Sequence, residues 1–421
     1  MLPDARKTGK RFPARASAIS VVHNARMPAA PSLSRSHPSD ASAGVAWSSL
    51  AALAAGHFAV DCCTGIWPVY KTLAQLDLTK AGLIAMTGSI SGNGLQLAFG
   101  LLADRGWRNR LLVAGLALSG AVTLVPWTDS YLLLFALVLV TYLGAGAFHP
   151  AGTGAAALLS RSRTGMVVGV FMAGGYAGYA LSQTLFSTVY AWSHAWTPVL
   201  LVIPLAAAAA VALRMPPMVA PLRAGRGMRA SVARHRRLLS ALFLVQVFAT
   251  AISLSLVFLL PDLMMARGAP SWMVQGGMHM ALVLGGCVSL LPAGHAADRW
   301  GARRVLLAAN TATGLLLAVF LLRSSASVLD LVLVAAFGAF NCINNVVTVS
   351  EGNRTLPGET SAVSALLMGL PWCFAAVAVA LAGTLADAAH GGTPVAALTW
   401  LGLAIPAALT ASLCVRPRAV V

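Results

Sequence analysis

Long apolar runs separated by short polar breaks are the feature that most constrains the fold of this chain. A helix that crosses a bilayer needs about 20 mostly apolar residues. The 421 residues are 58% hydrophobic and only 10% charged, with a mean hydropathy of +0.78, whereas about a quarter of a soluble domain is charged. We therefore expect an all-α polytopic membrane protein with twelve transmembrane helices. The expected spans are 47–71, 80–103, 110–128, 131–159, 165–191, 196–214, 239–263, 272–297, 304–322, 328–350, 361–386 and 394–415.

The longest break between apolar runs divides these spans into two sets of six. It contains three prolines and a cluster of arginines, which is typical of a connecting segment rather than a spanning helix. The expected domains are an N-terminal six-helix bundle at 47–214, a cytoplasmic linker at 215–238, a C-terminal six-helix bundle at 239–415 and a short cytoplasmic tail at 416–421.

Residues 1–46 form a separate segment that is rich in Arg, Ser, Ala and Pro. They lack the apolar core of a secretory signal peptide. One interpretation is a disordered basic cytoplasmic tail. The other is a start codon assigned too far upstream, with Met27 as the alternative start. A transit peptide fits the composition less well.

The basic residues are distributed very unevenly between the two sides of this predicted bundle. With the N-terminus in the cytoplasm, 25 of the 29 Lys and Arg residues fall on the cytoplasmic side. The other side receives only Lys71, Lys80, Arg267 and Arg323. The positive-inside rule therefore places both termini in the cytoplasm. Most of the net charge of +17 is explained by topology and by contact with the anionic lipid bilayer, so we expect no nucleic-acid partner.

An internal repeat supports two related halves. The segment GLLADR at 100–105 recurs as GHAADR at 294–299, and both copies follow the second helix of a set of six. Parallel repeats of this kind, with a substrate site between them near the bilayer midplane, characterise one large class of transporters. We therefore expect two pseudo-symmetric six-helix bundles.

At these loops the sequence resembles the major facilitator superfamily, whose signature is Gly-x-x-x-Asp-Arg-x-Gly-x-Arg-Arg. The second copy, GHAADRWGARR (294–304), matches every fixed position. The first copy, GLLADRGWRNR (100–110), has Trp107 in place of Gly and Asn109 in place of a basic residue. The resemblance implies the major facilitator fold. It also implies a gating role, with a charge network that latches the halves together, for Gly100, Asp104, Arg105, Gly294, Asp298, Arg299, Gly301 and Arg303. The alternative is a solvated turn that only sets topology.

Three further motifs resemble the fosmidomycin-resistance-like branch of that superfamily. They are HFAVD at 57–61 followed by Pro68, FHP at 148–150 and GGYAG at 174–178. The resemblance covers about residues 47–415 and implies proton-driven export of small toxic compounds. Three departures limit it. Ala151 replaces an acidic residue, Ser182-Gln183 replaces the Gly-Pro usual in antiporters, and no Lys or Arg is expected at mid-membrane to bind a phosphonate. We therefore do not assign fosmidomycin as the substrate.

His57 and Asp61 are the strongest candidates for proton coupling. They are four residues apart, so they share one helix face, and an ionisable residue inside a membrane span is functional by default because its burial is costly. The alternative is a structural hydrogen bond. His149, beside Pro150, is a candidate for substrate binding or proton relay, with a hydrogen bond at a helix kink as the alternative.

Other intramembrane polar residues have weaker support. Asn93, Gln96 and Asn344 line a cavity in one interpretation and join neighbouring helices in the other. Gly174, Gly175 and Gly178 are expected to serve helix packing, and His279 has no motif support. No set of His, Cys and Asp has metal-site spacing, and no phosphate-binding loop is present. We therefore expect no metal, no cofactor and no ATP hydrolysis.

Together these features predict a secondary active transporter rather than an enzyme. We expect proton-coupled efflux of a small organic compound by alternating access, with protons and the small-molecule substrate as its ligands. Uptake by proton symport or facilitated diffusion is the alternative, and a non-transporting sensor is disfavoured because there is no soluble output domain. The expected state is a monomer in the inner (plasma) membrane of a bacterium.

Overall fold

The computed structural model describes residues 45–160, 163–216, 232–356, 363 and 365–415. The expected N-terminal tail lies outside the described residues except for its last two, and so does most of the expected linker. Within the described part of the chain, the secondary structure is helical throughout, as the apolar runs predict.

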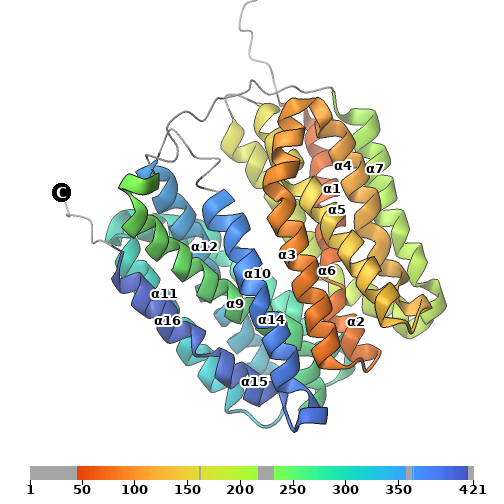
Figure 1. Cartoon of the computed structure of the whole chain (residues 1–421), viewed down its shortest axis with the longest axis vertical. Coiled ribbons are helices and arrows are strands. Elements are labelled where there is room, and N and C mark those ends of the chain that lie inside the picture. The colour runs from red at the N-terminus through yellow and green to blue at the C-terminus, as the bar shows by residue number, and fades with distance from the viewer. Residues whose placement is uncertain (1–44, 161–162, 217–231, 357–362, 364, 416–421) are drawn as a thin grey trace, which may run out of the picture. The chain divides into compact units, whose positions relative to one another are not determined.

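Helices of the first set come from residues before the linker and are coloured red to green in Figure 1. In chain order they are α1 (Trp47–Thr64), α2 (Trp67–Leu73), α3 (Leu78–Leu102), η1 (Ala103–Trp107), α4 (Arg108–Ser119), η2 (Gly120–Trp127), α5 (Tyr131–Leu158), α6 (Thr164–Trp192), η3 (His194–Leu201) and α7 (Val202–Arg214).

Helices of the second set follow the linker and are coloured green to blue. They are α9 (Arg236–Ala266), η4 (Met273–Gly277), α10 (Met278–Trp300), α11 (Ala302–Leu321), α12 (Val328–Thr355), η5 (Ala365–Gly369), α14 (Leu370–Ala386), η6 (Ala388–His390), α15 (Pro394–Leu401) and α16 (Ala404–Leu413).

Eleven elements in the described residues are long and apolar enough to cross a membrane. One of them, Leu78–Trp127, has 50 residues and contains both the second and the third predicted spans. It bends at Gly106, which has a φ of 96°. The eleven elements therefore match the twelve predicted spans, and the chain is a multi-pass integral membrane protein with the predicted all-α architecture.

The two copies of the loop motif turn at a glycine with positive φ. Gly106 (φ 96°) separates α3 from α4, and Gly301 (φ 84°) separates α10 from α11. Glycine adopts this conformation without the steric cost that a Cβ would bring. In the first copy this glycine simply precedes Trp107, whereas in the second it follows Trp300. Trp107 therefore occupies the expected glycine position without removing the turn.

The two sets of helices meet along α3 and α14, which lie side by side in Figure 1, and also along α6 and α10. The first seam is tight where α3 begins, because a Cβ added to Gly82 would lie 2.9 Å from the backbone oxygen of Val379. Further along α3 it loosens: a Cβ on Gly94 would meet only the Cys373 sulfur, at 3.8 Å. The sets are thus joined closely at the end of the helices opposite Gly106, here called the distal end. The other end, which holds the Gly106 and Gly301 turns, is called the motif end.

The glycines of the GGYAG motif lie where α6 crosses α1. A Cβ on Gly174 would approach the backbone oxygen of Ala54 to 2.3 Å, and a Cβ on Gly178 would approach that of Phe58 to 2.0 Å. Backbone atoms cannot move aside as a flexible side chain can. The two helices therefore approach as closely as they do only because these side chains are missing.

We predict opposite effects for two glycine-to-alanine substitutions on α6. Gly178→Ala forces α6 away from α1 and should lower the free energy of unfolding by about 1–3 kcal/mol, as overpacked sites do. Gly169→Ala has no atom within 4 Å of the new Cβ, so it should be neutral or gain up to about 1 kcal/mol from helix propensity. Thermal denaturation of the detergent-solubilised protein measures both. Equal effects would contradict the packing role of Gly178.

Candidate functional site

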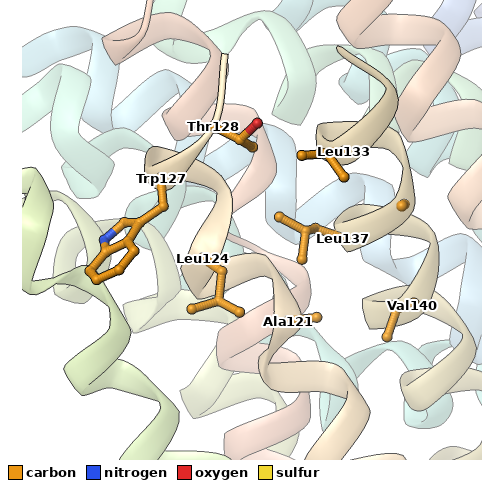
Figure 2. Close-up of a pocket in the computed structure, with 8 residues that line it drawn as sticks. Ala121, Leu124, Trp127, Thr128, Leu133, Leu137 and Val140 are labelled. Atoms are coloured by element: carbon orange, nitrogen blue, oxygen red, sulfur yellow. The ribbon is translucent and has the colours of Figure 1, made fainter. Parts of the chain in front are cut away.

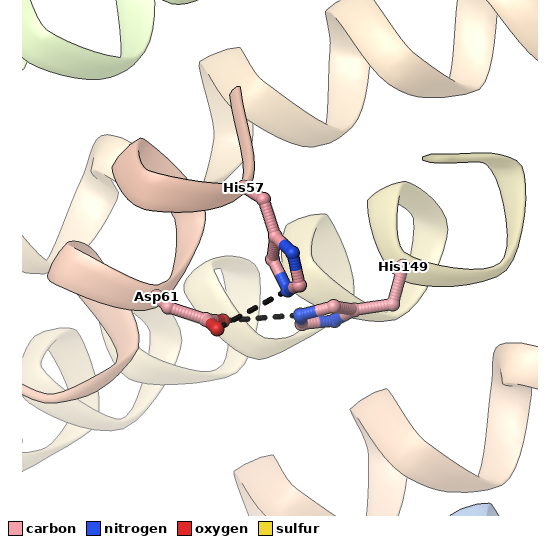
Figure 3. A group of neighbouring side chains, drawn as sticks. All are labelled: His57, Asp61 and His149. Carbon is pink, nitrogen blue, oxygen red and sulfur yellow. Dashed lines mark hydrogen bonds and ion pairs between the residues drawn. The ribbon is translucent and has the colours of Figure 1, made fainter. Parts of the chain in front are cut away.

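A carboxylate held by two imidazoles lies inside the first set of helices (Figure 3). His57 and Asp61 come from α1, and His149 comes from α5. The Nε2 atom of His57 is 3.2 Å from Oδ2 of Asp61, and the Nε2 atom of His149 is 3.0 Å from Oδ1. Each carboxylate oxygen thus faces one ring. The sequence predicted the first contact from helix spacing, whereas the fold brings in His149 from 88 residues away.

The other nitrogen of His57 determines where protons can lie. Nδ1 of His57 is 2.8 Å from the backbone carbonyl of Phe171. A carbonyl only accepts hydrogen bonds, so this Nδ1 must carry a hydrogen. Nε2 then bonds to Asp61 only if one further proton is present, on the imidazole or on the carboxyl group. The His57–Asp61 pair therefore holds one exchangeable proton while both bonds are made.

A glycine and an aromatic ring hold this pair in place. A Cβ added to Gly175 would lie 2.5 Å from Nε2 of His57 and 2.6 Å from Oδ2 of Asp61. Gly175 is therefore the residue that gives the pair room against α6. The Phe171 ring stacks on His57 with centroids 4.2 Å apart and an interplanar angle of 22°. The ring orientation is thus set by packing and by the carbonyl together.

The three side chains differ in access to the surroundings. The side chain of His57 is only 4% exposed, whereas those of Asp61 and His149 are 20% and 28% exposed. Asp61 and His149 are therefore the partly accessible members of the group. His57 is shielded, and the titratable group that its Nε2 contacts is Asp61.

The same three residues could hold a metal ion. One ligand atom from each, two imidazole nitrogens and one carboxylate oxygen, lies within 4.8 Å of the others. Sequence spacing predicted no such set. It could not do so, because only tertiary packing places His149 beside α1.

The weaker polar candidates divide into two groups. Gln96 donates to Oδ1 of Asn93 at 2.9 Å, and Asn93 donates to the backbone oxygen of Ser89 at 2.9 Å, so these partly exposed amides form a ladder along α3. For Asn344 the contacts favour the second interpretation, a link between neighbouring helices. It is 1% exposed and accepts from Asn310 at 2.8 Å, between α12 and α11. Its amide joins two helices of the second set.

The expected gating residues lie in the turns at the motif end or in the helices beside them, and each aspartate pairs within its own set. Asp104 binds Arg108 at 2.9 Å, and Asp298 binds Arg354 of α12. Arg299 lies over the ring of Trp300, with 6.0 Å to its centroid. Around the glycines there is space: a Cβ on Gly294 meets nothing within 4 Å, and one on Gly100 meets only Pro150, at 3.6 Å. Among the described residues, the expected latch between halves is not formed in this conformation. The remaining gating residues are Arg105, which is exposed, Arg303, which is partly buried, and Gly301, which makes the second turn.

Sequence reasoning missed a charge pair that joins the two sets at the distal end. Lys71 of α2 is fully buried and forms an ion pair with Asp262 of α9. The hydroxyl of Thr72 donates to the other oxygen of Asp262 at 2.8 Å. The ring of Phe258 lies 4.5 Å from the Lys71 ammonium nitrogen. Both charges fall at the ends of apolar runs, where the sequence predicts wet loops, and no local pattern links them.

A second polar contact between the sets lies on the other seam. His279 of α10 is 1% exposed, and its Nε2 lies 2.8 Å from the backbone carbonyl of Tyr179 on α6, to which it donates. Its ring packs edge-on against that of Tyr179, with centroids 4.6 Å apart. The residue without motif support thus joins α10 to α6 across the second seam.

The hollow drawn in Figure 2 has a different character from the triad of His57, Asp61 and His149. It has a volume of about 370 Å³ and lies between η2 and α5. Its lining is apolar apart from Thr128 and includes Leu124, Trp127 and Leu137. Since it carries no ionisable group, it offers no chemistry for coupling.

Comparisons with known proteins agree with this architecture. The family model of the Major Facilitator Superfamily matches residues 42–351. The chain is 24% identical over 347 residues to YfnC of Bacillus subtilis (strain 168), described as an uncharacterized MFS-type transporter, which covers 78% of this chain and 83% of that one. Solved structures share the fold. The nucleoside transporter NupG has a TM-score of 0.67 at 14% identity, covering 88% of this chain and 100% of that one. A bacterial homologue of the lysosomal transporter Spinster, inward-facing and occupied, has a TM-score of 0.66 at 12% identity, covering 88% and 95%.

We predict that breaking one side of the Lys71–Asp262 pair costs more than removing both charges. Asp262→Asn leaves the buried ammonium of Lys71 without a counter-ion and should lower the free energy of unfolding by about 3–5 kcal/mol. The double substitution Lys71→Met with Asp262→Leu should recover most of that loss, because an apolar pair of similar volume needs no compensation. Thermal denaturation in detergent compares the three proteins. A double variant no more stable than Asp262→Asn would contradict the pairing argument.

Proposed function

Because the chain belongs to the Major Facilitator Superfamily, whose members are transporters and not enzymes, we propose that it exports a small organic compound in exchange for protons. The observation that carries this proposal is the Asp61 carboxylate held by His57 and His149 within the membrane-spanning helices. Such a group is costly to bury and is retained where ions or protons move.

We propose that coupling occurs through a change in the group that neutralises the charge of Asp61, from an imidazolium to a proton on the carboxyl group itself. When Asp61 is ionised, an imidazolium at His57 or His149 balances it, and the carboxylate can also attract a solute. When a proton joins the carboxyl group, that attraction weakens and the solute is released. His149 and Asp61 are the exposed members, so they meet the solute and the proton, whereas buried His57 holds the shared proton.

The proposed gate lies at the distal end. Lys71 with Asp262 and His279 with the Tyr179 carbonyl join the two sets of helices there. A contact present in only one conformation biases the equilibrium toward that conformation. Opening the distal end would break both contacts, and closing the motif end would let Asp104, Arg105 and their counterparts pair across the halves.

The proposed orientation follows from charge. With 25 of the 29 basic residues on the side of the motif loops, the positive-inside rule makes the motif end cytoplasmic. The conformation described here is then closed to the outside. In it, Asp61 and His149 are the members of the triad that a cytoplasmic compound reaches first.

Uptake is the second candidate, and one observation favours it. Ser182-Gln183 stands where antiporters of this family usually carry Gly-Pro, and α6 runs unbroken through it from Thr164 to Trp192. Gln183 is 1% exposed, and neither polar atom of its side chain has a hydrogen-bond partner. Position 183 is not a proline, so α6 has no break there. This absence of the antiporter feature is the observation that favours uptake.

Proton release from inside-out vesicles tests the proposal. The vesicle interior is acidified, a pH-sensitive dye reports its pH, and a panel of antibiotics and metabolites is added. We expect at least one compound to trigger proton release in the wild type. In Asp61→Asn release should fall to the level of vesicles without the protein, because the amide cannot carry a proton. His390→Asn, which alters an exposed histidine far from α1 in the chain, should behave like the wild type.

Two other results would contradict the proposal. Equal proton release from wild type and Asp61→Asn would place the coupling proton on another residue. Equilibration of labelled compounds across the membrane, with no proton release from any of them, would favour facilitated uptake.

A further inference from the structure

We propose that His57, Asp61 and His149 form a binding site for a divalent transition-metal ion, with Zn²⁺ as the reference ion. The three possible ligand atoms, two Nε2 nitrogens and a carboxylate oxygen, already lie within 4.8 Å of one another. The two nitrogen–oxygen contacts of 3.2 and 3.0 Å are close to the separation of neighbouring ligands around an ion bound at about 2.0–2.2 Å.

Backbone carbonyls orient both rings for this role. A metal-binding imidazole usually donates its other N–H to a carbonyl or a carboxylate, which fixes the tautomer and the direction of the lone pair. Nδ1 of His57 does so to Phe171 at 2.8 Å, and the His149 ring has a backbone hydrogen bond to Ala145, one turn earlier on α5. Each ring therefore turns Nε2 toward Asp61. This support is more specific than mere proximity of three ionisable groups.

The donor set selects the class of ion. Two imidazole nitrogens and one carboxylate suit Zn²⁺, Co²⁺ or Ni²⁺, whereas Ca²⁺ and Mg²⁺ require mainly oxygen ligands. Two neutral rings and one carboxylate carry a single negative charge, which partly offsets the charge of the ion. Three protein ligands leave a fourth position for water or a solute. The exposed edges of Asp61 and His149 give the ion a path of entry.

Metal binding at this site must release protons. The other nitrogen of each ring donates to a backbone carbonyl, so the His57–Asp61 and His149–Asp61 contacts each hold one proton while they are hydrogen bonds. A metal ion would take the place of these two protons between the Nε2 atoms and the carboxylate. Ligands bind in their deprotonated form, so binding weakens as the pH falls. The proposal shares residues with the proposed coupling site but does not rest on it, because binding is measured on the purified protein without any transport.

Calorimetric titration with ZnCl₂ tests the proposal. The protein is purified in detergent through a tag that contains no histidine, and the titration is repeated in buffers of different ionisation enthalpy to count released protons. We expect one site per chain and release of at least one proton. Asp61→Asn and His149→Gln should each weaken binding by about tenfold or more. His390→Asn is the matched control, because His390 is exposed and lies 4.0 Å from Asp387 in a similar pair, and it should leave the affinity unchanged.

Cobalt spectroscopy distinguishes this site from thiol ligands. Co²⁺ bound by two histidines and a carboxylate lacks the intense sulfur-to-metal charge-transfer band that ligation by Cys62 or Cys63 would produce. That band, a wild-type titration without proton release, or equal affinity in the wild type and both variants would each overturn the proposal. Where a variant fails to fold by size-exclusion chromatography, the wild-type proton count and cobalt spectrum still decide. Zn²⁺ binding as expected, together with vesicles that release no protons, would uphold this inference while overturning the proposed export.

Discussion

Pairing of buried charge is the constraint on which the rest of this structure depends. An uncompensated charge among apolar helices costs several kcal/mol, whereas a hydrogen-bonded partner removes most of that cost. The chain follows this rule at Asp61, which is bound on both oxygens, and at Lys71, which is fully buried against Asp262. It follows it again at Asp330, fully buried between Arg267 and Arg323. Every basic residue that the positive-inside count left on the minority side, including Lys80 with Asp77, has an acidic partner. The exceptions to the topology rule are thus the residues whose charge is neutralised locally.

Glycine residues on α6 leave the space in which the buried His57–Asp61 pair forms. The His57–Asp61 pair occupies the space that a side chain at position 175 would fill, and the neighbouring glycines of α6 bring α1 close enough for Phe171 to stack on His57. The GGYAG motif therefore links packing to chemistry: the same close approach that joins two helices also shapes the site. A motif that sequence analysis assigned to packing alone also sets the geometry of the titratable group beside it.

The fold was predictable from sequence to within a few residues, because hydropathy and breaks act locally. The predicted span 131–159 is observed as Tyr131–Leu158, and 394–415 as the combined span Pro394–Leu413 of α15 and α16. The site was predictable only in part. Helix spacing gives His57 with Asp61, but nothing local indicates that His149 reaches them or that Lys71 meets Asp262, 191 residues away. Asn344 shows the converse limit: its position in an apolar run fits a cavity as well as a helix contact, and its bond to Asn310, which no local pattern indicates, favours the helix contact.

The two ends of the helices use their charges differently, and this difference is the physical basis that we propose for alternating access. At the distal end Lys71 and Asp262 join the two sets, whereas at the motif end Asp104 with Arg108 and Asp298 with Arg354 pair within one set. Opening the distal end must separate a buried pair, and the charges need either water or new partners at that moment. The motif end can offset this free-energy cost only if Asp104 and Asp298 exchange their present partners for basic residues of the opposite set. We therefore expect the free-energy difference between the two conformations to be set by this exchange of ion pairs, with the proton on the His57–Asp61 pair as a small bias on a nearly balanced equilibrium.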